Sequence, residues 1–125
     1  MEDTSKAART AAALGVGKLK RHIFVCADQT NPKCCAKQAG LASWERLKSR
    51  LAELGMDKGE GAVFRTKANC LRICEQGPVA VVYPEGIWYH SVTPEVVDQI
   101  IEEHLAGGRP VEEYILARDP LTGDK

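Results

Sequence analysis

The chain has 125 residues, of which 44% are hydrophobic and 27% are charged, so it suits one globular domain with a substantial core. Seventeen basic and seventeen acidic side chains leave a formal net charge of zero, so no field of the whole molecule favours nucleic acid or an anionic membrane. The apolar run near the start is short and interrupted by glycines, which argues against an export signal and a membrane span. We therefore expect a cytoplasmic protein, whose cysteines would ligate metal or carry redox chemistry rather than form disulfides.

The first segments predict an arm and then a strand. Residues 1–20 are small, polar and basic towards the end, and they are expected to form a mobile arm with a short helical turn. His22–Cys26 is a compact apolar run of strand-forming residues, which Asp28, Asn31 and Pro32 then interrupt. The first strand of the domain is therefore predicted to end at the first cysteine.

A helix and a second strand are predicted next. The helix runs from about Cys35 to Leu54, and Gly55 is suited to the left-handed position that ends it. Its apolar residues recur every three or four positions, at Trp44, Leu47, Leu51 and Leu54. After a glycine-rich turn, the second strand covers Ala62–Thr66. A right-handed crossover between the two strands makes them parallel.

Parallel pairing of these strands has a consequence for the cysteines. Cys26 ends the first strand, and Cys70 comes four residues after the second. The carboxyl ends of parallel strands lie at the same edge of a sheet. The topology therefore predicts that two thiols far apart in sequence come together.

A hairpin follows. Val79–Tyr83 is a continuous apolar run typical of a strand covered on both faces. The turn at Pro84–Gly86, with proline second and glycine fourth, joins it to a strand at Ile87–His90. Because side chains alternate along a strand, one of the rings of Trp88 and Tyr89 should face away from the core and could contact a second chain.

The last predicted helix begins with a Thr-Pro-Glu sequence at Thr93, which supplies a hydroxyl cap and a proline at the first helical position. It extends to about Leu105, and His104 near its carboxyl end is placed where a cation is favoured. An apolar tail segment follows at residues 114–116. The expected class is α/β with a mixed sheet in the order β-α-β-β-β-α, with a domain over residues 21–118 and a tail over 119–125.

The five cysteines form two groups in the pattern C-x7-C-C-x34-C-x3-C. Single cysteines are often small buried hydrophobes, but polar neighbours such as Gln29, Lys33, Lys67 and Asn69 disfavour that role here. Structural zinc sites usually take a close C-x2-C pair, and redox-active dithiols usually present C-x-x-C at a helix N-terminus. Both readings stay open as weaker alternatives, because the wide and unequal spacing fits two bridged irons better.

Several stretches resemble the thioredoxin-like [2Fe-2S] ferredoxins over about residues 21–116. They are the strand that ends at Cys26, the Cys-Ala-Lys-Gln-Ala-Gly sequence from Cys35 to Gly40, the Cys70-x-x-x-Cys74 pair, and the Gly-Pro-Val sequence from Gly77 through the hairpin to Tyr89. The resemblance implies a thioredoxin-like fold, one [2Fe-2S] cluster, transfer of single electrons to redox partner proteins, and a homodimer.

Carried over position by position, the resemblance implies that the cluster ligands are Cys26, Cys35, Cys70 and Cys74. Cys35 is preferred to Cys34 because the family's second ligand is followed by the same kind of helix start. A small [2Fe-2S] subunit of an NADH-oxidising or hydrogenase complex is the nearest alternative. Such subunits resemble the chain in the second cysteine pair but bring a helical domain ahead of the first ligand.

Several basic residues accompany the cysteines. Lys33, Lys37, Arg65, Lys67 and Arg72 lie near the ligands in sequence. They are interpreted either as solvated surface residues or as groups that offset cluster charge and dock an acidic partner. No serine constellation, carboxylate pair or suitably placed histidine indicates catalysis, so no enzymatic activity is expected.

Overall fold

A computed structural model describes residues 4–27, 37–73 and 76–121. Its centre is a mixed five-stranded sheet in the order β2-β1-β3-β4-β5. The strands are β1 (Arg21–Cys26), β2 (Val63–Ala68), β3 (Ala80–Tyr83), β4 (Ile87–Tyr89) and β5 (Ile115–Arg118). The helices are α1 (Ser5–Leu14), α2 (Lys37–Glu53) and α3 (Pro94–Gln99), and α3 continues as a π-helix, η1 (Ile100–Ala106). A short 3-10 turn, η2 (Glu112–Tyr114), precedes β5.

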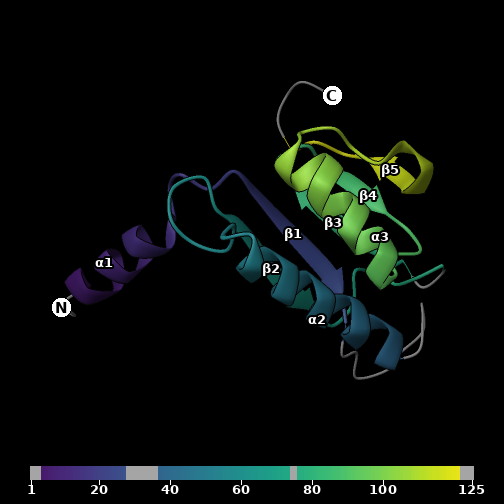
Figure 1. Ribbon diagram of the computed structural model, residues 1–125, viewed down its shortest axis with the longest axis horizontal. Helices are drawn as coiled ribbons and strands as arrows, with labels where there is room; N and C mark the ends of the chain where they lie inside the picture. Colours follow the sequence, from purple (N-terminus) through teal and green to yellow (C-terminus); the bar gives the residue numbers. More distant parts are fainter. Residues whose placement is uncertain (1–3, 28–36, 74–75, 122–125) are drawn as a thin grey trace.

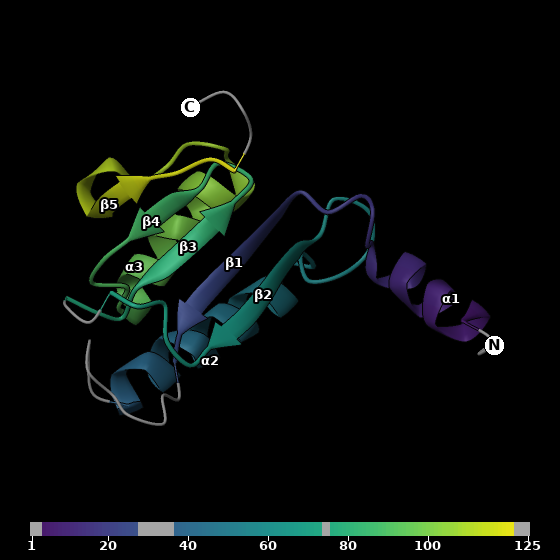
Figure 2. The same ribbon diagram turned by 180° about the vertical axis from the view of Figure 1, so that it is seen from behind.

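The strand pairing confirms the predicted parallel pair. β1 and β2 run parallel in a register that places Cys26 opposite Ala68, whereas β3 is antiparallel to β1, and β4 is antiparallel to β3. Both α2 and α3 lie on the same face of this sheet (Figure 1). Seen from behind, the strands are in front and the two helices are behind them (Figure 2). The opposite face of the sheet is thus free of helices among the described residues.

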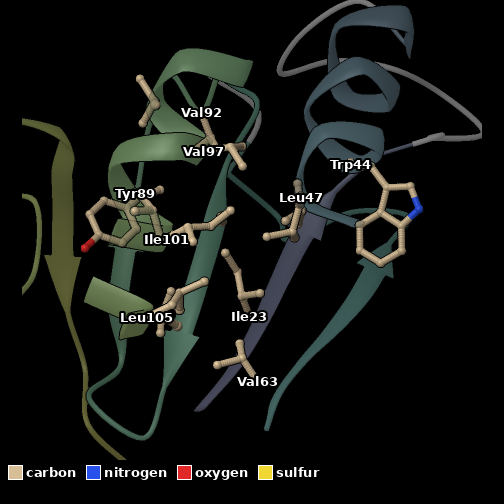
Figure 3. Packing of buried hydrophobic residues seen from close by; sticks show 14 of the residues in the cluster. Ile23, Trp44, Leu47, Val63, Tyr89, Val92, Val97, Ile101 and Leu105 are labelled. Carbon is tan, nitrogen blue, oxygen red and sulfur yellow. The ribbon is translucent and has the colours of Figure 1, made fainter. Parts of the chain in front are cut away.

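The core lies between the sheet and the two helices (Figure 3). From the sheet come residues such as Ile23, Val63 and Tyr89, and from the helices come Leu47 and Ile101, all of which are almost completely buried. At roughly 1.5–3 kcal/mol for each large apolar side chain removed from water, this layer is the main stabilising contribution of the domain. It fixes α2 and α3 against the strands that carry the cysteines.

Helix ends follow the local sequence signals. Thr93 caps α3, with its hydroxyl accepting a hydrogen bond from the Val96 N–H at 3.4 Å, and Pro94 occupies the first turn as predicted. Gly55 adopts a φ of 67° after α2, as expected for a left-handed terminator. Leu54, predicted to lie on the buried face of α2, is instead 46% exposed. The helix ends at Glu53, so Leu54 no longer follows its periodicity.

Three elements differ from the sequence-based expectation. The arm contains a ten-residue helix, α1, rather than a short turn. The apolar tail segment is a fifth strand, paired antiparallel with β4, which extends the predicted β-α-β-β-β-α order by one strand. The last helix changes from α to π geometry at Ile100. The sheet begins with β1 at Arg21 and ends with β5 at Arg118.

The helix-free face of the sheet, called here the open face, is rich in aromatic rings. Its side chains come from the alternate strand positions that point away from the core: His22, Phe24, Phe64, Thr66, Val81, Tyr83 and Trp88. The rings of His22 and Phe24 stack at 4.2 Å, and Phe24 meets Tyr83 edge-on at 6.2 Å. As predicted, Trp88 faces away from the core while Tyr89 is buried in it.

Candidate metal centre

The cysteine edge of the sheet is where β1 and β2 end and β3 begins. Cys26 is the last residue of β1, and Cys70 follows two residues after the end of β2. Because these strands are parallel and in register, their carboxyl ends bring both residues to the same edge. The predicted convergence of the two cysteine groups is therefore confirmed for Cys26 and Cys70. Cys34, Cys35 and Cys74 lie outside the described residues.

Cys26 is held inside the fold. It is only 2% exposed, and its Sγ accepts a hydrogen bond from the Val79 N–H at 3.0 Å. Its own N–H donates to the Val79 carbonyl at 2.9 Å. The thiol is thus fixed between β1 and the start of β3, and its sulfur already has one of the N–H contacts that stabilise a thiolate.

Helix α2 packs closely against this position. A Cβ built on Gly40 would lie 3.0 Å from the Cys26 carbonyl oxygen and 3.1 Å from the Ala27 Cα. Any larger residue would push the start of α2 away from the end of β1. Gly40, part of the sequence that carries the family resemblance, therefore lets the first turns of α2 approach the cysteine edge.

Cys70 differs from Cys26 in being exposed. Its Sγ accepts a hydrogen bond from the Arg72 N–H at 3.2 Å. That contact bends the loop tightly, and Arg72 has a φ of 71°, in the left-handed region that residues with a side chain rarely occupy. The two described thiols are therefore alike in accepting a backbone N–H, but one faces the interior and the other faces solvent.

The segment before β3 completes this edge. Gln76, with a φ of 52°, and a cis peptide bond between Gly77 and Pro78 lead into the strand. The Pro78 carbonyl accepts the Val92 N–H at 2.9 Å, and the Gln76 carbonyl accepts the Ser91 N–H at 2.8 Å. These two hydrogen bonds join the segment before β3 to the loop between β4 and α3.

Thiol sulfur is the ligand that iron-sulfur clusters take from proteins, and the arrangement of Cys26 and Cys70 fits that use. Both sulfurs lie at one edge, accept backbone N–H groups and have no disulfide between them. Within residues 4–27, 37–73 and 76–121, no group of three or more His, Cys, Asp and Glu side chains could hold a metal.

The comparisons with known proteins agree with this site. No model of a protein family matches the chain. A 2Fe-2S ferredoxin of Aquifex aeolicus is 34% identical over 110 residues, covering 82% of this chain and 95% of the relative. A 2Fe-2S ferredoxin of Clostridium pasteurianum is 38% identical over 97 residues, covering 74% and 92%. This chain belongs to the 2Fe-2S ferredoxin family.

Solved structures assign the fold as well. The crystal structure of the thioredoxin-like [2Fe-2S] ferredoxin from Aquifex aeolicus is similar with a TM-score of 0.65 at 34% identity, covering 78% of this chain and 96% of that one. The ferredoxin therefore has a thioredoxin-like fold, as the sequence predicted. In addition, none of its described helices has the length and apolar character needed to cross a membrane.

A second polar site, away from the cysteines, was not foreseen. His104 in η1 is fully buried, and its Nδ1 lies 2.8 Å from the Tyr89 hydroxyl while its Nε2 lies 3.2 Å from a Glu85 carboxylate oxygen. Glu85 in turn accepts two-pronged hydrogen bonds from Arg21, the closest at 2.9 Å. The Tyr89 hydroxyl accepts the Val111 N–H at 3.0 Å. We call these four side chains, Arg21, Glu85, Tyr89 and His104, the buried network.

The ionisation states in the buried network follow from burial and pairing. Burial lowers the pKa of His104, outweighing the opposing effect of Glu85, and this favours the neutral ring. Lys20 and Arg21 supply cations at this helix end by donating to the Ala106 and Leu105 carbonyls. Burial raises the pKa of Tyr89 to about 12, which keeps its hydroxyl protonated as a donor to His104.

Proposed function

We propose that this ferredoxin carries single electrons on one [2Fe-2S] cluster held by Cys26, Cys35, Cys70 and Cys74. The observation that supports the proposal is that Cys26 and Cys70 follow the ends of two parallel strands at one sheet edge, each with its sulfur hydrogen-bonded to a backbone N–H. A cluster bound there supplies reversible one-electron chemistry at a potential set by such hydrogen bonds and by burial. The chain itself supplies the ligands and excludes water on the Cys26 side.

The relatives support the second cysteine pair. Two further structures of the Aquifex aeolicus ferredoxin carry single cysteine-to-serine substitutions at positions four residues apart. Cys70 and Cys74 have the same separation. Cys35 remains our choice over Cys34 for the ligand from the first loop.

Metal analysis tests the proposal directly. Protein purified without oxygen should be coloured and should contain about two iron and two acid-labile sulfide per chain. Cys35→Ser should lose the cluster and Cys34→Ser should keep it. Colourless protein that contains zinc, or that contains no metal, would refute the cluster. Cluster loss confined to Cys34→Ser would show that Cys34, and not Cys35, is the ligand.

The same proposal covers the setting in which the ferredoxin acts. We infer a cytoplasmic carrier that exchanges electrons with redox partner proteins, that binds neither nucleic acid nor membrane, and that catalyses no reaction of its own. The net charge of zero and the five cysteines support this setting. Fractionation of the native cells, followed by detection of the protein with an antibody, tests the location.

A homodimer formed through the open face is part of the proposal. The outward side chains of this face carry no permanent charge, and burial lowers the pKa of His22, which favours its neutral form. Two identical copies can therefore meet without like-charge repulsion, as an isologous interface requires. Large aromatic rings such as Phe24 and Trp88 are the residues enriched at such interfaces.

Light scattering during size-exclusion chromatography tests the dimer. The wild-type ferredoxin should have twice the monomer mass, and Trp88→Lys should shift it to the monomer mass because two lysines would be buried against each other. Leu54→Lys is the matched control, because Leu54 is an exposed apolar residue away from the open face. A Trp88→Lys protein that stays dimeric would remove the open face as the interface.

A further inference from the structure

The distribution of charge around Cys70 is uneven although the chain as a whole is neutral. Four cations lie along the edge strand β2, in the loop after it and at the first described residue of α2: Lys37, Arg65, Lys67 and Arg72. We call them the basic rim. Between Gly61 and Ile73, and between Lys37 and Trp44, the sequence has no acidic residue. The basic rim is therefore drawn from stretches of sequence that contain no carboxylate of their own.

The fold places these cations in a row that leads to the exposed cysteine. β2 is the outermost strand of the sheet, and Arg65 and Lys67 alternate with residues of the open face, so they lie on the side covered by α2. Lys67 is opposite Val25 in the pairing with β1, one position before Cys26. Cys70 itself is exposed. The row thus ends at the point where an approaching protein would come closest to the site.

Two contacts hold the row in place. The Arg65 guanidinium lies 5.6 Å from the centre of the Trp44 ring, a cation–π distance that orients the side chain along α2. The Arg72 N–H is bonded to Cys70 Sγ, so its exposed side chain starts directly beside the thiol. These contacts orient Arg65 along α2 and place the start of the Arg72 side chain beside Cys70.

Among the described residues, α3 brings acidic side chains to its contact with α2. Glu95 is exposed in the first turn of α3, and α3 covers a different part of the sheet from β2 (Figure 1). Asp98 in the same helix is paired with Arg46 at 2.8 Å. One side of the cysteine edge is thus positive while the other is mixed.

We propose that the basic rim is the docking surface for an acidic protein partner of the ferredoxin. The inference rests on the proposed electron-carrier function and adds the chemistry of the partner to it. A cluster with four thiolates is anionic and would repel carboxylates, and the rim offsets that repulsion where the partner approaches. Complementary charge of this kind speeds encounter and orients the complex, after which one electron passes between the cluster and the partner's redox centre without any bond being made or broken.

Binding of an acidic probe tests the surface without relying on electron transfer. The cluster-loaded ferredoxin is titrated into a fluorescently labelled oligoglutamate peptide at low ionic strength, and binding is followed by fluorescence anisotropy. We expect Lys67→Gln to weaken binding about twofold or more, because exposed charges act over a screening length of roughly 10 Å. Lys67→Arg should bind like the wild type, and 0.5 M salt should abolish the difference.

Lys58→Gln is the matched control. Lys58 is an exposed lysine before β2, at the opposite end of the strand from Lys67. Its replacement should leave oligoglutamate binding unchanged. Equal effects of Lys58→Gln and Lys67→Gln, or tighter binding of an oligolysine peptide by the wild type, would overturn the inference.

Electron transfer to a small anionic oxidant provides the second measurement. Ferredoxin reduced with dithionite is mixed with the cobalt(III) complex of EDTA, which accepts one electron. Lys67→Gln should slow the reaction about twofold at low salt and Lys58→Gln should not. Protein without iron and sulfide would refute the proposed function, whereas an intact cluster whose oxidation is equally fast in Lys67→Gln would refute only the acidic partner.

Discussion

The two ends of the sheet differ in the burial and hydrogen bonding of their polar side chains. At the cysteine edge, Cys70 is exposed beside a row of cations, and the described thiols form no disulfide. Towards the other end, Arg21, Glu85 and His104 bond to one another and to Tyr89 in a closed set. A polar group whose hydrogen bonds are made within the fold stabilises the protein. An exposed polar group at the cysteine edge can instead bind a ligand or a partner.

The first prediction concerns Cys26 and Cys70, which share one role but differ in burial. Cys26→Ala and Cys70→Ala should each abolish cluster binding, as measured by iron and sulfide content. In the metal-free protein only Cys26→Ala should lower the free energy of unfolding, by about 1 kcal/mol, because it removes the acceptor of the buried Val79 N–H. Equal stabilities of the two metal-free variants in urea would show that the buried thiol contributes to ligation alone.

The buried network gives the second prediction. Glu85→Gln removes the charge that pairs with Arg21 at 2.9 Å and should destabilise the ferredoxin by about 2 kcal/mol, below the range for fully buried pairs because Glu85 is partly exposed. Glu112→Gln is the control: its pair with Arg118 is just as short, at 2.7 Å, but is largely exposed. It should cost less than about 0.5 kcal/mol.

Urea unfolding of both variants, with the metal content checked at the start, measures this difference. Cluster content should be the same in the two variants, because Glu85 lies in the turn after β3, at the end of the strand away from Val79. A Glu85→Gln protein as stable as Glu112→Gln would mean that the network is no more than a surface ion pair.

Much of the cysteine edge could be predicted from the sequence, because it depends on local signals. The apolar run that ends at Cys26, the helical periodicity of α2 and the second apolar run were sufficient to give two parallel strands. Once the strands are parallel, geometry brings Cys26 and Cys70 to one edge. The cap at Thr93 and the terminator at Gly55 were also predicted for the same reason.

The features that were missed depend on partners distant in sequence. β5 was predicted only as an apolar tail because it does not alternate clearly: Ile115 is half-buried and the following residues are exposed, so its pairing with β4 comes from main-chain bonds. Nothing near His104 in sequence indicates that it will meet Tyr89 and Glu85. Its place near the helix end favours a cation, whereas burial lowers its pKa.

The third prediction isolates one hydroxyl in the buried network. Tyr89→Phe keeps the buried ring (Figure 3) but removes the acceptor of the Val111 N–H and the donor to His104 Nδ1. Leaving two buried polar groups without that partner should cost about 1–2 kcal/mol. Tyr83→Phe, on the open face, should change the urea midpoint little, and an equal loss in both variants would count against the hydroxyl.

The smallest predicted effect is a dependence of stability on pH. Burial lowers the pKa of His104 in the folded protein below its ordinary value of 6.5. At a pH between these two pKa values, His104 binds a proton in the unfolded chain but not in the folded protein. Stability is therefore complete above about pH 6.5 and falls as the solution is acidified through the folded pKa. Burial shifts the pKa of His22 in the same direction.

The two rings are separated by urea midpoints of the metal-free protein, measured from about pH 8 to about pH 5.5, on both sides of the ordinary histidine pKa of about 6.5. Partial burial acts to raise the pKa of Glu85, but hydrogen bonds from Arg21, the backbone and His104 lower it below 4.5, so this carboxylate contributes only in more acidic solution. His104→Gln should flatten the pH dependence more than His22→Gln, because His104 is fully buried and His22 is only half-buried. If the urea midpoint of His104→Gln depended on pH as steeply as that of the wild type, the acid sensitivity would arise outside the buried network. Burial at this end of the sheet would then have no larger effect on proton binding than exposure at the cysteine edge.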